Sequence, residues 1–154
     1  MARTKEPKGT RVQVQPHLCF EGRCAEAVAF YRTALGAEVL FLMRFKDMPG
    51  PHPPGAIPPG AEDKVMHASF RVGDSTVLAS DGRCTGRADF QGIQLAIQVS
   101  DEATAQRLFT ALADGGQVQM PLAQTFWSPR FGMVADRFGV SWMVNTASPG
   151  TAQQ

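Results

Sequence analysis

The chain lacks a dominant charge, a long apolar run and a secretion signal. Its 154 residues include 15 Lys plus Arg and 14 Asp plus Glu, so the net charge of +1 gives no long-range attraction for nucleic acid or anionic lipid. No apolar stretch approaches the roughly 20 residues that cross a bilayer, and the basic first ten residues contain no apolar segment. We therefore expect a cytoplasmic protein without nucleic-acid or membrane partners.

The cysteines are too few and too irregularly spaced to form a disulfide framework or a zinc knuckle. Cys19, Cys24 and Cys84 are odd in number and have no CxxC spacing. We expect free thiols. Cys24 lies at the start of a predicted helix, where the helix dipole would stabilise a thiolate, and simple packing is the alternative role.

The length is that of one ordinary domain with a single core. We interpret residues 1–11 as a solvated tail, 12–147 as the domain and 148–154 as a second tail. Alternation of apolar and polar residues predicts half-buried strands over 12–20, 64–72 and 75–80. Helical spacing predicts a helix over 25–35 that ends at Gly36. Residues 38–46 are a further strand candidate, and the Pro- and Gly-rich segment 48–60 predicts an exposed loop.

The same order of elements begins again near residue 93. A strand is predicted over 93–99 and a helix over 102–112, with Asp101 as its N-cap, and further strands over 117–122, 130–136 and 140–146. Residues 30–39 and 108–118 are similar, and each group follows a strand and a helix. The repeat indicates a tandem duplication, with one module over 12–90 and the other over 91–147.

Several local segments carry a family resemblance. FEGRCAEAVAFY at 20–31, DKVMHA at 63–68 and DRFGVSWMVN at 136–145 occur in the same order as in the PhnB-like branch of the vicinal oxygen chelate superfamily, as do segments 73–75, 78–81, 125–127 and 131–132. That superfamily includes glyoxalase I, extradiol dioxygenases and bleomycin-resistance proteins. The resemblance covers about residues 12–145.

The resemblance implies an α+β fold. Two tandem βαβββ modules would form a concave eight-stranded sheet or open barrel with the helices outside. The interior would hold the active site, commonly completed in a homodimer, so a homodimer is expected here too.

Metal-dependent members of the superfamily place His, Gln or Glu ligands on the first and last strands of each module. Here those positions hold Gln15 and His17 in the first module and Gln94 in the second, while Ala79 and Met143 stand where a carboxylate is needed. One imidazole with neutral glutamines supplies too few donors for a divalent cation. We therefore predict no metal and no cofactor, with a divergent site through His17 and Gln94 as the alternative.

His67 is the first candidate for chemistry. It shares the polar side of its predicted strand with Ser69 and Arg71, whereas Ala68 and Phe70 point to the opposite, apolar side. An imidazole near a guanidinium can transfer a proton or orient a ligand; a structural histidine is the alternative. The candidate ligand-binding side chains are Gln15, His17, Ser69, Arg71, Gln94, Trp127 and Phe131.

These residues favour a protein that binds a small organic molecule in the concave sheet without metal, either to sequester it or to transform it by acid–base chemistry. Two other functions stay open at this point. One is a divalent-metal-dependent lyase, isomerase or dioxygenase, and the other is a dimeric interaction module without ligand. The sequence does not name the ligand, because a fold does not specify a substrate.

Overall fold

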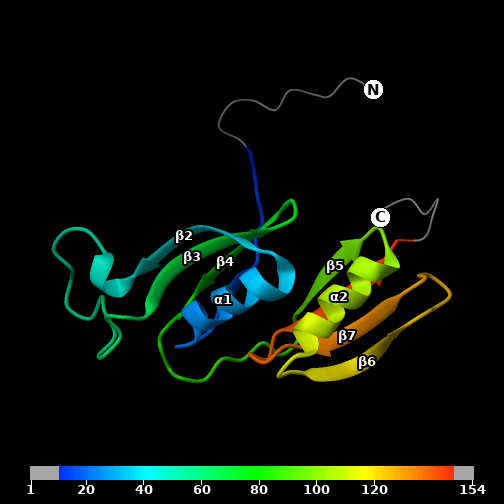
Figure 1. Ribbon diagram of the computed structural model, residues 1–154. Coiled ribbons are helices and arrows are strands. Elements are labelled where there is room, and N and C mark those ends of the chain that lie inside the picture. Colours follow the sequence, from blue (N-terminus) through cyan, green and yellow to red (C-terminus); the bar gives the residue numbers. More distant parts are fainter. Residues whose placement is uncertain (1–10, 148–154) are drawn as a thin grey trace.

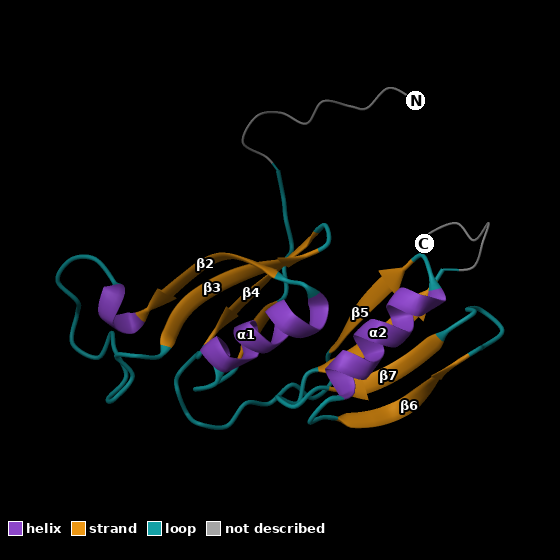
Figure 2. Cartoon of the chain, in the orientation of Figure 1, coloured by secondary structure: helices purple, strands orange, loops and turns teal. Residues whose placement is uncertain are grey.

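The computed structural model describes residues 11–147 and contains two βαβββ units joined by an extended segment (Figures 1 and 2). The first unit consists of β1 (His17–Cys19), α1 (Cys24–Leu35), β2 (Glu38–Arg44), a 3-10 turn (Phe45–Asp47), β3 (Val65–Val72) and β4 (Ser75–Ser80). The second consists of β5 (Gln94–Val99), α2 (Glu102–Ala113), β6 (Gln117–Ala123), β7 (Phe131–Ala135) and β8 (Ser141–Thr146). This order confirms the tandem duplication and the α+β class.

The eight strands form two separate four-stranded sheets. The N-terminal sheet has the order β1-β4-β3-β2, and the C-terminal sheet has the equivalent order β5-β8-β7-β6. In both, the first strand pairs parallel with the last one, and the other pairs are antiparallel. Over residues 11–147 no strand of one sheet pairs with the other sheet, so the single chain does not close a barrel.

Each helix has one end with the signal expected from the sequence. Gly36 ends α1 in the left-handed conformation with φ of 66°, and its N–H donates to the Tyr31 carbonyl. Asp101 begins α2 by accepting a hydrogen bond from the Thr104 N–H at 2.8 Å. The first turn of α1 is capped from a distance, because a buried carboxylate that follows β4, Asp81, accepts the Cys24 N–H at 2.8 Å.

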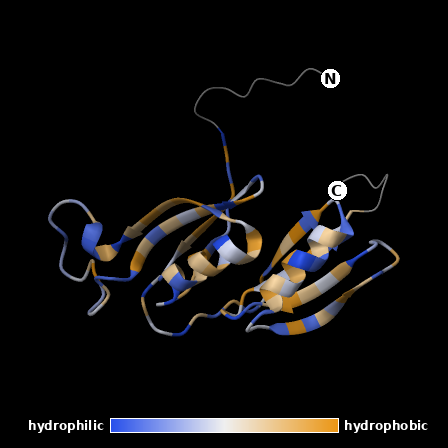
Figure 3. Cartoon of the chain, viewed as in Figure 1, coloured by the Kyte–Doolittle hydropathy of each residue, from blue (hydrophilic) through white to orange (hydrophobic). Residues whose placement is uncertain are grey.

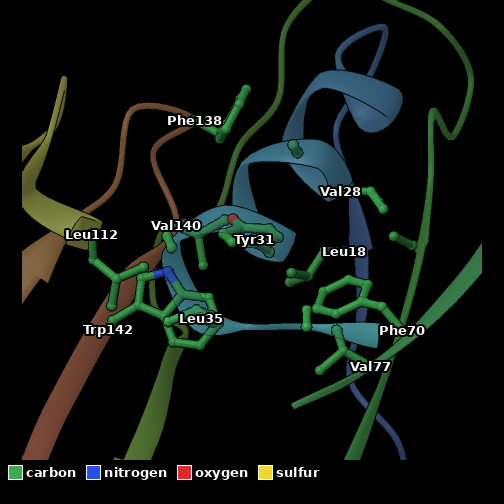
Figure 4. Packing of buried hydrophobic residues seen from close by; sticks show 14 of the residues in the cluster. Leu18, Val28, Tyr31, Leu35, Phe70, Val77, Leu112, Phe138, Val140 and Trp142 are labelled. Carbon is green, nitrogen blue, oxygen red and sulfur yellow. The ribbon is translucent and has the colours of Figure 1, made fainter. Parts of the chain in front are cut away.

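One hydrophobic core runs through both modules (Figure 4). The helix α1 packs on the N-terminal sheet, α2 packs on the C-terminal sheet, and the two helices contact each other. Tyr31 of α1 lies at the junction: its ring stacks on Phe70 of β3 at 5.5 Å between centroids and meets Trp142 of β8 edge-on at 5.6 Å. A single helix thus buries apolar area against strands of both sheets.

A buried carboxylate fixes this junction. Oδ2 of Asp136 accepts hydrogen bonds from the Tyr31 hydroxyl at 2.5 Å and from Nε1 of Trp142 at 2.9 Å. Its Oδ1 accepts the backbone N–H groups of Phe138 and Val140. Burial raises the pKa of Tyr31, and the neighbouring carboxylate raises it further, so the hydroxyl keeps its proton at neutral pH. Asp136 therefore joins α1 of the first module to the β7–β8 hairpin of the second.

The first strand is shorter than the alternation over 12–20 predicts. Only His17–Cys19 pairs with β4, and residues 11–16 belong to no strand. Val12 and Val14 are 89% and 93% exposed. Alternation specifies which side of a strand a residue occupies, but a strand also needs a partner, and the pairing of β1 with β4 starts only at His17. The prediction of a strand over 12–16 was therefore wrong within the single chain.

The Pro- and Gly-rich segment contains no strand, as predicted. It leaves the end of the N-terminal sheet between β2 and β3 (Figure 1). Hydrophobic and hydrophilic residues alternate along β6, whereas β2 is hydrophobic over most of its length (Figure 3). The segment thus extends one end of the N-terminal sheet, just before the strand that carries His67.

Candidate functional site

The side of the N-terminal sheet that faces away from α1 carries a row of polar and aromatic side chains, which we call the open face. The register of the four strands aligns His17 of β1 with Leu78 of β4, Ser69 of β3 and Phe41 of β2. The neighbouring residues in sequence, such as Ala68, are buried in the core on the other side. The β3 parity predicted for His67 and Ser69 is therefore found in the structure.

Two histidines meet on the open face. The ring centroids of His17 and His67 lie 5.9 Å apart, and the ring of Phe41 lies 6.0 Å from that of His67. Nε2 of His17 is 2.9 Å from the Ser80 hydroxyl oxygen, and the sulfur of Cys19 is 3.9 Å from the same oxygen. The three strands β1, β2 and β3 thus bring an imidazole pair beside an aromatic ring, although the residues are far apart in the sequence.

The electrostatics of the pair favour neutral imidazole at His17. Partial burial lowers the pKa of His17, and repulsion from His67 lowers it further. Arg71, at the other end of the open face, forms an ion pair with Glu38 of β2. The guanidinium that the sequence places with His67 is therefore already held by a carboxylate.

The thiols differ sharply in environment. Cys19 is exposed on the open face, whereas Cys24 is fully buried. Burial and the nearby Asp81 carboxylate raise the pKa of Cys24 to about 12. Cys24 therefore does not form the thiolate that its position at the start of a helix could have stabilised. It packs in the core instead.

The remaining predicted site residues lie elsewhere. Gln94 begins β5 of the C-terminal sheet, where its amide nitrogen lies 3.9 Å from the sulfur of Met133. Phe131 is buried at the start of β7, and the ring of Trp127 packs on it at 5.3 Å. Gln15 precedes β1 and belongs to no strand. The structure therefore brings His17, His67 and Ser69 together. Gln94 and Phe131 lie on the C-terminal sheet, and Trp127 lies in the loop between β6 and β7.

A cleft of about 710 Å³ lies at the end of the C-terminal sheet and includes Gln94. The segment before β5 forms one wall, and the amides of Gln94 and Gln119 and the hydroxyl of Ser141 form part of the lining. Gln119 reaches Ser141 only at 3.5 Å. This cleft is separate from the imidazole pair and contains no histidine.

A divalent metal would need three or more convergent donors. Among residues 11–147 no group of three or more His, Cys, Asp or Glu side chains is arranged to hold one. On the open face His17 and His67 supply two imidazoles, and the one acidic side chain there that the strands align, Glu38, is paired with Arg71. The donor set therefore does not fit the usual hard or borderline metal site.

Two contributors to the open face were missed from the sequence. Phe41 escaped because a register shift between Val39 and Phe41 changes the side on which the next residues of β2 lie. Ser80 is the last residue of β4, and only the pairing of β1 with β4 reveals that it meets His17. The alternation along β4 weakly indicates on which side Ser80 lies, but nothing in the local sequence indicates that Phe41 lies on the open face.

No helix within residues 11–147 is long and apolar enough to cross a membrane.

The family model described as 3-demethylubiquinone-9 3-methyltransferase matches residues 12–145. The protein YjdN of Escherichia coli is 34% identical over 145 residues, which cover 91% of this chain and 99% of that protein.

Solved structures give the same picture. Protein PA1353 from Pseudomonas aeruginosa is 41% identical, with a TM-score of 0.74 and coverage of 89% of this chain and 98% of that one. A putative 3-demethylubiquinone-9 3-methyltransferase, PhnB protein, from Bacillus cereus is 28% identical, with a TM-score of 0.72 and coverage of 88% and 100%. A glyoxalase-related enzyme from Fulvimarina pelagi, at 18% identity and a TM-score of 0.54 with 89% and 88% covered, shares the fold. The chain therefore belongs to the PhnB-like 3-demethylubiquinone-9 3-methyltransferase family, within the glyoxalase-type fold.

Proposed function

We propose that the chain binds a small organic molecule on the open face of the N-terminal sheet, without metal, and that His67 orients this molecule or exchanges a proton with it. The observation that carries the proposal is the meeting of His17, His67 and Phe41, with rings about 6 Å apart. The aromatic ring offers apolar contact area, while the imidazoles offer hydrogen bonds of fixed direction. This combination of an apolar surface with a few polar groups is typical of small-molecule sites.

Proton transfer is within the capacity of this pair. Imidazole changes its charge near neutral pH, and a lowered pKa at His17 provides a neutral acceptor beside a second imidazole. The proposal follows from these side chains rather than from the methyl transfer that the family description names. Whether the molecule is only sequestered or also converted depends on its own chemistry.

A second copy of the chain would complete the site. Each sheet leaves one side uncovered by helix, and apolar side chains project there or beside it: Phe41 and Leu40 on β2, Met120 on β6, and Phe126 in the loop after it, which is 97% exposed. The segment before β1 adds exposed Val12 and Val14. Burying such surface against an identical chain gains about 25 cal/mol per Å² of apolar area. Light scattering at micromolar concentration should give a dimer mass, and a monomer mass would contradict this part of the proposal.

The test of the site is a ligand screen by thermal shift on the wild type, His67→Asn and His52→Asn. The replacement at His67 keeps one hydrogen-bonding group but removes the titrating imidazole. His52 is a matched control, because it is exposed in the loop and its Nε2 lies 2.9 Å from the Met48 carbonyl oxygen, away from the open face. A ligand at about 100 times its dissociation constant raises the free energy of unfolding by about 2.7 kcal/mol.

We expect compounds that bind and stabilise the wild type and His52→Asn. Their affinity for His67→Asn should be at least about tenfold lower, a loss of about 1.4 kcal/mol in binding free energy. The melting temperature of ligand-free His67→Asn should stay close to that of the wild type. A structural histidine would give the reverse: lower stability by about 1–3 kcal/mol from an unpaired partner, with unchanged ligand affinity.

The metal-dependent alternative has its own measurement. Elemental analysis of purified, untagged protein should find far less than one transition metal per chain, and chelator should leave the melting temperature and ligand affinity unchanged. One metal per chain, lost in His17→Gln, would establish the alternative. A protein that binds no compound in the screen but forms a stable dimer would instead be an interaction module.

A further inference from the structure

The open face has more side chains that can carry a positive charge than carboxylates that could balance them. β1 contributes His17 and Cys19, β3 contributes His67 and Arg71, and β2 contributes Glu38, while β4 (Ser75–Ser80) contributes no ionisable group. The carboxylate of Glu38 is taken by the ion pair with Arg71. The two imidazoles therefore have no carboxylate partner among the aligned side chains, so protonation leaves a positive charge that no protein group balances.

The other charged side chains near this sheet also already have hydrogen-bond or ion-pair partners. Arg44, at the end of β2, donates to the backbone carbonyl of Asp63, and the Asp63 carboxylate pairs with Lys46 at 2.8 Å. The buried Asp81, beyond β4, accepts three backbone N–H groups, including that of Val65. None of these groups supplies a counterion for the imidazole pair.

The hydrogen bond between Ser80 and His17 leaves one ring nitrogen of His17 free to donate to a ligand. The Ser80 hydroxyl oxygen accepts the backbone N–H of Gly82 at 3.1 Å, so its proton is available for Nε2 of His17. In that arrangement the His17 ring carries its proton on Nδ1, the nitrogen away from Ser80. The ring of His67, whose centroid lies 5.9 Å from that of His17, forms no hydrogen bond within residues 11–147, so it offers a second donor.

We infer that the molecule bound on the open face is a small organic anion whose acidic group accepts hydrogen bonds from His17 and His67 while its apolar part lies on Phe41. The inference rests on the proposed function and names the chemical class of its ligand. A carboxylate has two oxygens, each able to accept a charge-assisted N–H bond of about 2.7–2.9 Å, and can therefore bridge two imidazoles whose rings are separated in this way.

The effect on His17 follows from the sign of the charges. Without ligand, partial burial and repulsion from His67 lower the pKa of His17. A bound anion opposes the repulsion and favours the imidazolium form, so it raises the pKa of His17. By linkage, the anion must then bind more tightly as the pH falls.

Benzoate and benzamide are suitable probes, because they have nearly the same shape and differ in charge. The chain has three histidines, so proton NMR can follow each ring separately. We expect millimolar benzoate to shift the ring resonances of His17 and His67, to leave the resonance of His52 in place, and to bind at least about fivefold more tightly near pH 6 than near pH 8. A rise of one unit in the pKa of His17 corresponds to about tenfold tighter binding to its charged form. Benzamide should bind more weakly, without this pH dependence.

His17→Gln and His67→Gln should each weaken benzoate binding at least about fivefold near pH 6, while His52→Gln should not. Spectral dispersion and the melting temperature check that each variant is folded. Equal binding of benzamide and benzoate at both pH values would overturn the inference but leave the proposed function intact, since the open face would still bind small molecules. Failure of benzoate to move either resonance would also overturn it, and the proposed function would then depend on the wider compound screen.

Discussion

Replacing Tyr31 by Phe removes one hydroxyl from the junction of the two modules and nothing else from the core. The Tyr31 side chain is fully buried, and its hydroxyl donates to Oδ2 of Asp136 at 2.5 Å. Asp136 keeps three other donors, the Trp142 indole and two backbone N–H groups, so the carboxylate is not left bare. A hydrogen bond to a charged group contributes about 1.5–3 kcal/mol to stability, and we expect Tyr31→Phe to lose an amount in this range.

For a chain of this size each kcal/mol changes the melting temperature by roughly 2–4 °C, so the expected decrease is roughly 3–12 °C. Unfolding in urea, followed by tryptophan fluorescence, gives the free energy directly. Thr33→Val is the matched control: it removes a hydroxyl from the same helix, but Thr33 is exposed and its bond to the Ala29 carbonyl is 3.5 Å long. A loss below about 0.5 kcal/mol for Tyr31→Phe, equal to that of the control, would refute the view that Asp136 ties the modules together.

Three further predictions concern the open face, the thiols and the long loop. The pKa of His17 is lowered in the folded chain, so the folded state binds a proton less readily than the unfolded state does. Stability that is present above the unfolded pKa of about 6.5 is therefore lost as the pH falls through the lower pKa of the folded state. Urea titrations near pH 7.5 and pH 5 should show a smaller loss of unfolding free energy in His17→Gln than in the wild type. Iodoacetamide at neutral pH should label Cys19, while Cys24, with its pKa raised to about 12, should react only on unfolding; prompt labelling of Cys24 would contradict its burial. Residues 53–59 lie outside any strand and none of them is buried, so deleting them should change the melting temperature by less than about 2 °C. A larger decrease would show that this segment packs as structure.

The sequence predicted those parts of the fold that depend on local chemistry. The glycine that ends α1 and the aspartate that begins α2 are local signals, and so is the alternation that places His67 and Ala68 on opposite sides of β3. Gly36 must adopt a positive φ, and Asp101 needs only the N–H of a residue three positions later. These interactions lie within a few residues of one another, so they are readable from the sequence.

Long-range interactions were not predictable in the same way. Tyr31 and Asp136 are separated by 105 residues, and neither has a sequence neighbourhood that indicates the other. Residues 12–16 alternate like a strand but have no partner strand in the single chain. The predicted ligand-binding set combined polar residues chosen by alternation on β3 with the aromatic residues Trp127 and Phe131, which lie in and after the β6–β7 loop of the other module. Alternation specifies a side of a strand, whereas only strand pairing specifies which sheet that strand joins.

The partners of the polar side chains separate those that serve the fold from those available for chemistry. Asp81 and Asp136 are nearly fully buried, and each accepts three or more hydrogen bonds from N–H or O–H groups. A buried carboxylate satisfied in this way has little capacity left to bind a ligand, and removing it would leave several donors unpaired. His17 has the Ser80 hydroxyl as its hydrogen-bond partner and keeps a second ring nitrogen, and it stands beside His67 on an uncovered surface. The capacity to recognise a molecule from solution therefore lies with the imidazoles of the open face, while Asp136 joins the two modules and Asp81 holds elements of the first module together.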